Sequence, residues 1–193
     1  MTLIESLQNI PDFRRKQGRR YPLTTLLLIT IMSIISGRCR YREIAAFAKA
    51  NQEEFLTYFD LVKRKRLASH VTFREVIKGV DFDKVNTAFQ QWAGQYVTLE
   101  PEEWLAVDGK ALGSTVTDYD SKYQNFVSLV SVFSHKRGQV LGTAKLENMK
   151  SSEIPTVQDL IATLNLHGVI FTLDALHCQK KPSKSLLTAE TTI

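Results

Sequence analysis

The feature that most constrains the fold of this chain is a change in the spacing of apolar residues near Pro101. Before this point apolar residues recur every three or four positions, which is the spacing of amphipathic helices. After it they alternate with polar residues in Phe126–Phe133 and Gln139–Leu146, which is the spacing of half-buried strands. The sequence therefore predicts an all-helical domain over residues 1–97 and an α/β domain that starts at residue 102.

The first half contains the most apolar segment of the chain, Leu23–Ser36. Pro22 precedes it, where a helix can begin without losing a hydrogen bond, and Gly37 follows it, where a left-handed residue can end a helix. A membrane-spanning helix needs about 20 apolar residues, whereas this segment has 14 residues and includes threonines and serines. We therefore expect a buried helix over residues 22–36, no membrane partner and a cytoplasmic protein.

Polar residues mark the starts of two later helices. Thr72, followed three positions later by Glu75, is typical of a capping box, which predicts a helix that begins after Thr72. Asp81 stands at the equivalent position before a second helical segment. The first half is thus predicted to be a bundle of helices joined by short connections.

The second half predicts the order strand, strand, strand, helix, strand. The segments are Trp104–Asp108, Phe126–Phe133, Gln139–Leu146, Pro155–Leu166 and Gly168–Leu173, with a hairpin turn at 135–138. A strand that follows such a helix returns to the same sheet through a right-handed crossover. The last strand is therefore expected to lie parallel to the first.

Asp108 and Asp174 each follow an apolar segment that is predicted to be a strand. Ligands of open α/β sheets bind at the carboxyl ends of strands, so these two carboxylates are candidates for one site. A carboxylate pair suits Mg²⁺, which can activate a water or a 3′-hydroxyl for phosphodiester chemistry. Two plainer interpretations stand beside this one: Asp108-Gly109 is a common hairpin-turn dipeptide, and Asp174 is a possible helix cap.

Several motifs in a fixed order carry a resemblance to a known family. They are Val107–Lys110, residues 127–142, Lys150–Pro155 and residues 172–180 in the second half, and residues 10–23, 36–48 and 69–76 in the first. Over about residues 4–181 the chain resembles DDE-type bacterial insertion-sequence transposases, and within them the H-repeat-associated group.

The resemblance implies a ribonuclease-H-like α/β fold for residues 102–181, with Asp108 and Asp174 as catalytic residues and Mg²⁺ ligands. It also implies a third acidic residue, a glutamate on a later helix. Glu190 follows Asp174 too closely to occupy that position, and residues 182–193 resemble nothing in the family. We therefore expect a C-terminally truncated transposase with an incomplete catalytic sheet that cannot complete strand transfer.

Positive charge is concentrated in the first 100 residues, which hold 16 basic and 10 acidic side chains, whereas the remainder holds 9 and 10. Such clusters are often solvated faces, but they also bind phosphates and release counterions. With Lys110 beside Asp108, the candidates for contact with double-stranded DNA at insertion-sequence ends are Arg14, Arg15, Lys16, Arg19 and Arg20, then Lys63, Arg64, Lys65 and Arg66.

Three interpretations remain open from the sequence. The chain is an inactive transposase remnant, a DNA-binding module that occupies element ends and represses intact transposase, or the product of a pseudogene. A homo-oligomer and intact transposase are the expected protein partners. Cys39 and Cys178 form no CxxC pair, so a zinc module and a disulfide framework are not predicted.

Overall fold

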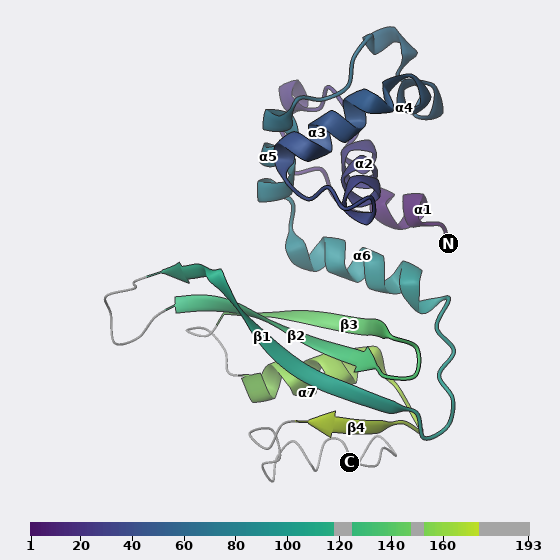
Figure 1. Cartoon of the computed structure of the whole chain (residues 1–193), viewed down its shortest axis with the longest axis vertical. Helices are drawn as coiled ribbons and strands as arrows, with labels where there is room; N and C mark the ends of the chain where they lie inside the picture. Colours follow the sequence, from purple (N-terminus) through teal and green to yellow (C-terminus); the bar gives the residue numbers. More distant parts are fainter. Residues whose placement is uncertain (118–124, 148–152, 174–193) are drawn as a thin grey trace. The chain divides into compact units, whose positions relative to one another are not determined.

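The structure is a computed structural model that describes residues 1–117, 125–147 and 153–173 (Figure 1). The chain divides into two compact units, Met1–Trp92 and the residues from Ala93 onward. The first unit is helical, and the described residues of the second form a mixed sheet and one helix. The predicted change from helices to strands is therefore confirmed.

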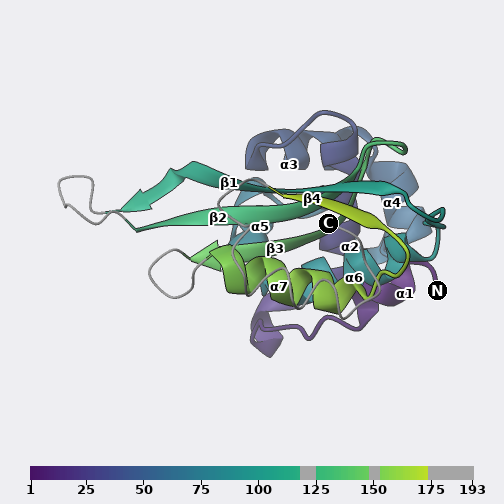
Figure 2. The same cartoon turned by 90° about the horizontal axis from the view of Figure 1, so that it is seen from below.

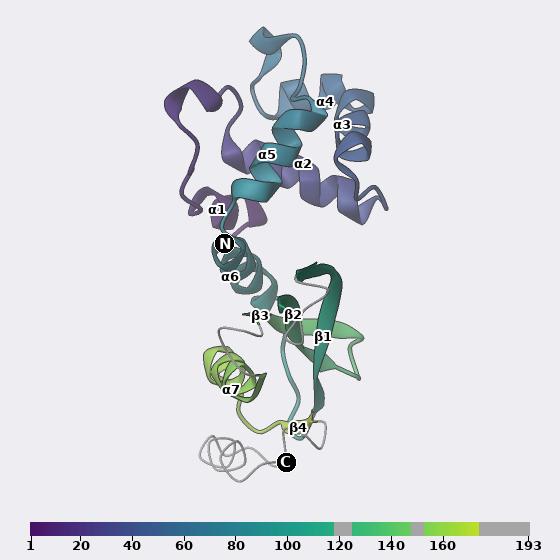
Figure 3. The same ribbon diagram turned by 90° about the vertical axis from the view of Figure 1, so that its left-hand side faces the viewer.

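The helical unit is built around one apolar helix, α2, as Figure 3 shows. Ile29 on α2 is fully buried, and α2 packs against α1, α3 and α5. The elements are α1 (Leu3–Gln8), α2 (Leu23–Ile35), α3 (Tyr41–Ala50), α4 (Gln52–Tyr58), α5 (His70–Gly79) and α6 (Phe82–Gly94), with short 3₁₀ turns η1 (Lys16–Gly18) and η2 (Val62–Arg64).

The bounds of α2 agree with the sequence. Pro22 stands directly before it, and Gly37 adopts a φ of +77° two residues after its end. That left-handed conformation costs glycine little, because glycine has no Cβ. Within the described residues no helix combines the length and apolarity that a membrane crossing requires.

The start of α5 differs from the prediction. The helix begins at His70, with Ser69 at the N-cap position, so the capping box predicted at Thr72 is wrong. The helix therefore includes His70, Val71 and Thr72, and it places Phe73 and Val76 fully buried in the core. Asp81 does cap α6, because its Oδ1 accepts from the amides of Asp83 at 2.9 Å and Lys84 at 3.2 Å.

In the part of the second unit that the structure describes, four strands form one sheet in the order β3-β2-β1-β4. They are β1 (Trp104–Thr117), β2 (Asn125–Ser134), β3 (Gln139–Glu147) and β4 (Ile170–Leu173), with α7 (Glu153–Leu164) between β3 and β4. The three sequential strands are antiparallel, and β4 lies parallel to β1, as the crossover argument predicts.

One face of the sheet packs on α7 (Figure 2). Leu105 and Val107 of β1 and Val130 and Val132 of β2 point into this core and are almost completely buried. The alternate residues of both strands lie on the opposite face, since successive side chains of a strand point to opposite sides. The side of the sheet that a residue occupies therefore follows from its position in the alternation.

Candidate functional site

Asp108 lies inside β1, not at its end. Asp108 pairs with Ser131 of β2, and the antiparallel ladder continues through Gly109 and Lys110. The prediction that the first strand ends at Asp108, and the alternative that Asp108-Gly109 forms a hairpin turn, are therefore both wrong. The physical reason is the length of β2, which supplies hydrogen-bond partners for β1 well beyond Asp108.

The side chain of Asp108 belongs to the sheet face opposite α7. It is exposed. Ala106, two positions before it, and Lys110, two positions after it, share its face. Cross-strand partners point to the same side of a sheet, so Ser131 stands beside Asp108 on this face. One carboxylate, one hydroxyl and one ammonium group thus occupy neighbouring positions on the sheet face opposite α7.

Asp108 directly follows the last described residue pair between β1 and β4. Val107 pairs with Leu173 in parallel register, and Asp108 is the next residue of β1. Asp174 is the next residue of the sequence after Leu173, and it lies outside the described residues, as do His177, Cys178 and Glu190. Among the residues that are described, no group of three or more His, Cys, Asp or Glu side chains is placed to hold a metal ion.

A carboxylate that sequence reasoning missed, Glu103, is buried directly before β1. Its Oε1 accepts from the hydroxyl of Ser134 and from Nε of Arg137 at 3.2 Å, and its Oε2 accepts from the amide of Glu100 at 3.1 Å. These donors, Ser134 first, lower the pKa of Glu103 to about 2. Glu103 thus ties the start of β1 to the β2–β3 hairpin, and nothing in its local sequence indicates this role.

The loop between α1 and α2 is organised by Arg14. Its Nε and Nη2 donate to the carboxylate of Asp12 at 2.9 and 2.8 Å, and Nη2 also donates to the carbonyl oxygen of Tyr21 at 2.8 Å. Nη1 donates to the carbonyl oxygen of Gly18 at 3.3 Å, and the side chain is only 10% exposed. The bonds from Arg14 hold the pKa of Asp12 below its ordinary value.

Tyr21 joins two basic segments that are far apart in the sequence. Its hydroxyl donates to the carbonyl oxygen of Arg66 at 2.9 Å. The guanidinium carbons of Arg20 and Arg64 lie 5.8 and 5.6 Å from the centre of its ring, within the range of cation–π attraction. Tyr21 directly follows the first basic segment in the sequence. This position is the signal that could have predicted that Tyr21 contacts arginines.

The predicted DNA-binding residues therefore fall into two groups. Arg14 is engaged inside its loop, and Arg19 donates to the carbonyl oxygens of Arg14 and Asp12, both at 2.7 Å, while its side chain remains half-exposed. The others on the helical unit belong to the two segments that Tyr21 joins, and all but the half-buried Arg64 are exposed. We call them the Tyr21 basic surface: Arg15, Lys16, Arg20, Lys63, Arg64, Lys65 and Arg66. Lys110 is exposed on β1.

The helical unit matches a known family. Residues 4–93 match the model of the family described as DDE_Tnp_1-associated. This range contains all six helices of the unit except the first residue of α1 and the last residue of α6, so the match covers the part of the chain that carries the Tyr21 basic surface.

Relatives resemble the chain over nearly all of its length. The "H repeat-associated putative transposase YhhI" of Escherichia coli (strain K12) is 29% identical over 92% of this chain and 46% of its own length. The "H repeat-associated putative transposase YbfD" of the same strain is 28% identical over 92% of this chain and 68% of its own length. The chain thus spans about half the length of the first of these relatives.

One solved structure also resembles the chain. It is a piggyBac transposase synaptic complex with hairpin DNA, which matches with a TM-score of 0.47 and 12% identity over 99% of this chain and 47% of that one.

Proposed function

We propose that this chain, a partial-length relative of the H-repeat-associated proteins with a DDE_Tnp_1-associated domain over residues 4–93, functions in DNA transposition by binding double-stranded DNA at insertion-sequence ends. The observation that carries the proposal is the Tyr21 basic surface. Tyr21 joins two basic segments that the sequence separates by more than 40 residues: the guanidinium groups of Arg20 and Arg64 lie near its ring, and its hydroxyl donates to the carbonyl oxygen of Arg66. A cluster of this kind neutralises several phosphates at once and releases their counterions.

The expected mode is contact with the phosphate backbone. Arginine and lysine side chains that meet phosphates fix the position of a protein on the duplex without reading its sequence. Arg14 is excluded from this role by its internal hydrogen bonds, and it acts as a positioning residue that holds the loop carrying Arg15 and Lys16. Binding should therefore be sequence-tolerant and steeply dependent on salt.

Fluorescence anisotropy with a labelled element-end duplex over a range of salt concentrations tests the proposal. We expect the quadruple substitution R15A/K16A/K63A/K65A to reduce the slope of log Kd against log salt by about 3.6, since each of the four lost phosphate contacts removes about 0.9. The matched control R42A/R74A/K78A/K84A removes the same charge from exposed sites on α3, α5 and α6. Equal slopes for the two variants would exclude the Tyr21 basic surface from the interface.

The second unit supports a proposal about the catalytic site. The mixed order β3-β2-β1-β4, with β4 parallel to β1 through a helix, is compatible with a ribonuclease-H-like sheet. We infer that Asp108 and Asp174 form a carboxylate pair, since each directly follows one member of the parallel pair Val107–Leu173. Lys110, on the same face as Asp108, would lie near a bound phosphate.

Asp108 suits a divalent cation that prefers oxygen ligands. Its carboxylate is exposed on the sheet face opposite α7, and the hydroxyl of Ser131 stands beside it. A bound Mg²⁺ ion would polarise a phosphate oxygen and lower the pKa of a water. Within the chain, the role of Asp108 is to hold one side of such an ion at the edge of the β1–β4 pairing.

We expect no Mg²⁺-dependent cleavage of element-end DNA by the 193-residue chain, because only two of the three carboxylates that the family resemblance implies are matched in it. A nicking assay with Mg²⁺ or Mn²⁺, with D108N as the control, tests this. Cleavage that disappears in D108N would contradict the expectation of inactivity while supporting the assignment of Asp108.

A second candidate function is DNA binding without catalysis, in which the chain occupies element ends and represses an intact transposase. The observation that favours it is that the Tyr21 basic surface lies entirely within the helical unit, so binding does not require the sheet. The two candidates separate when the chain is added to an assay of an active relative: repression should be lost in R15A/K16A/K63A/K65A and kept in D108N.

A further inference from the structure

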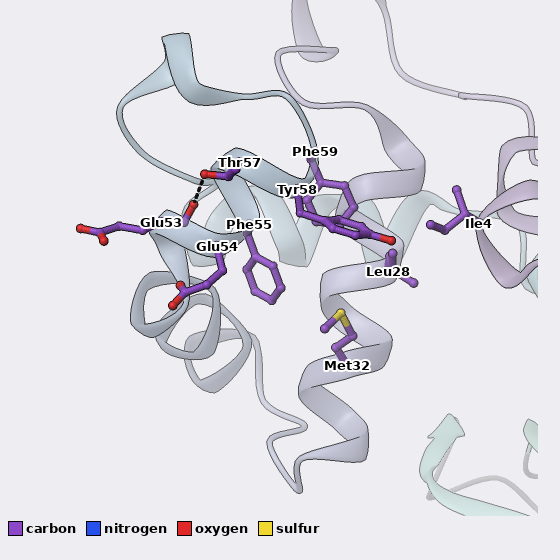
Figure 4. Close-up of a pocket in the computed structure, with 9 residues that line it drawn as sticks. All are labelled: Ile4, Leu28, Met32, Glu53, Glu54, Phe55, Thr57, Tyr58 and Phe59. Atoms are coloured by element: carbon purple, nitrogen blue, oxygen red, sulfur yellow. Dashed lines mark hydrogen bonds between the residues drawn. The ribbon is translucent and has the colours of Figure 1, made fainter.

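The helical unit contains a groove that the proposed DNA contact does not use. It lies between α2 and α4 with one side of α1, has a volume of about 920 Å³, and is shown in Figure 4. Leu28 and Met32 of α2 form one side, and Phe55 and Tyr58 of α4 contribute the other. Glu53 and Glu54 are exposed at its border. We call it the α2–α4 groove.

The groove has two glutamates, Glu53 and Glu54, among its lining residues. Within the described residues neither Glu53 nor Glu54 forms an ion pair, and Met32 and Tyr58 remain exposed beside them. An apolar groove of this size with charge on its border is typical of a surface that binds another chain, and its charge indicates that the occupant is apolar and basic.

The chain itself carries a segment with this chemistry. Ile35, at the end of α2, is 81% exposed, and Ile34 beside it is also exposed. Arg38 and Arg40 follow in the α2–α3 connection. The side chain of Arg40 is 87% exposed, and its ion pair with Glu43 of α3 is a long contact of 3.8 Å. An apolar tip followed by arginines is the complement of an apolar groove bordered by glutamates.

The tip and the groove share one helix. Ile35 follows Leu28 by seven positions and Met32 by three, so all three lie on one stripe of α2. Ile35 cannot enter the groove that its own helix forms, but the same stripe of a second copy can. A surface that carries both the projection and its complement is the requirement for a two-fold symmetric, self-complementary interface.

We propose that the α2–α4 groove binds a second copy of this chain in a two-fold symmetric dimer. The two α2 helices pack through the stripe of Leu28, Met32 and Ile35, with Ile35 of each copy in the groove of the other. Arg40 of each copy then faces Glu54 and its neighbour Glu53 across the interface. The dimer places two Tyr21 basic surfaces in one particle, but it does not depend on their binding DNA.

Sedimentation velocity of the full chain over a range of concentrations tests the proposal. We expect a monomer–dimer equilibrium that I35D weakens by more than about thirtyfold, the effect of losing a central apolar anchor. The matched control V71D, also an exposed apolar residue of the helical unit, should leave the equilibrium unchanged. A chain that stays monomeric, or a dimer that I35D and V71D affect equally, would overturn the proposal.

Charge reversal tests the orientation of the two copies. R40E and E54K should each weaken the dimer by roughly fivefold or more, because each brings like charges together at both ends of the interface. An equimolar mixture of the two variants should restore association, since both contacts then join opposite charges. The pair R74E and E75K, reversed on α5, is the control. Failure of the R40E and E54K mixture to associate better than either variant alone would exclude this arrangement.

Discussion

At the scale of single residues, neighbouring arginines of one basic segment have different roles. Arg14 directs its guanidinium into its own loop, whereas Arg15 is exposed and Arg20 lies beside the ring of Tyr21. A guanidinium can bridge several acceptors at once because its donors form a rigid fork. The sequence could not predict which arginine is engaged, because two of the acceptors are backbone carbonyls whose positions depend on the fold.

The internal role of Arg14 predicts a difference in stability. We expect R14A to lower the free energy of unfolding by about 2 kcal/mol, because the carboxylate of Asp12 and two carbonyl oxygens lose charged donors. R15A removes an exposed cation and should change it by no more than about 0.5 kcal/mol. Urea unfolding followed by circular dichroism measures both. If R14A and R15A changed the free energy of unfolding equally, the hydrogen bonds of Arg14 would make no net contribution to stability.

Glu103 predicts a dependence of stability on pH. Its pKa is about 2 in the folded chain and 4.5 ordinarily, so the folded state favours the ionised carboxylate. The stabilisation is complete above about pH 4.5 and is lost as the pH falls toward about 2. We expect E103Q to be less stable than the parent chain at neutral pH and to approach it in acid. Parallel stability curves for the two chains between pH 2 and 5 would contradict this role.

At the scale of elements, apolar spacing predicted most helices and strands but not their full lengths. The alternation in β2 and β3 is visible in the sequence, whereas Gly109–Thr117 of β1 has no regular alternation and extends as a strand because β2 pairs with it. Tertiary pairing overrides weak local preference in such segments. For the candidate site, the sequence predicted Asp108 but not its position within a strand.

The end of α2 provides a test of local conformation. Gly37 and Gly94 both have open space where a Cβ would be added, but only Gly37 has a positive φ. We expect G37A to destabilise the chain by about 1 kcal/mol and G94A to leave it unchanged or stabilise it by up to about 1 kcal/mol. Thermal unfolding of the two variants measures the difference. A neutral G37A would mean that α2 ends in another way.

At the scale of the whole molecule, each unit has a core of its own. The buried apolar residues of the helical unit form one cluster between Leu7 and Ala88, and those of the second unit form another around β1, β2 and α7. A domain needs such a core to fold independently. The two units therefore have separate sources of stability, and a substitution in one core should leave the other unit folded.

The separate cores predict the behaviour of a fragment. We expect residues 1–97 alone to be helical and to melt cooperatively, because every buried residue of the helical cluster lies within them. I29A should destabilise this fragment by about 2–5 kcal/mol. Calorimetry and circular dichroism measure both effects. A fragment that shows helix but no cooperative transition would mean that its core needs residues of the second unit.

The parallel pairing of Val107 with Leu173 also determines an order of events during synthesis. On a ribosome, β1, β2 and β3 emerge before α7 and β4, so the antiparallel meander can form while one edge of β1 still has no partner. Closing the long connection to β4 carries an entropic cost that local contacts do not. Until β4 arrives, that edge of β1 is open to strands of other nascent chains, and a pause in translation after residue 147 would lengthen this interval.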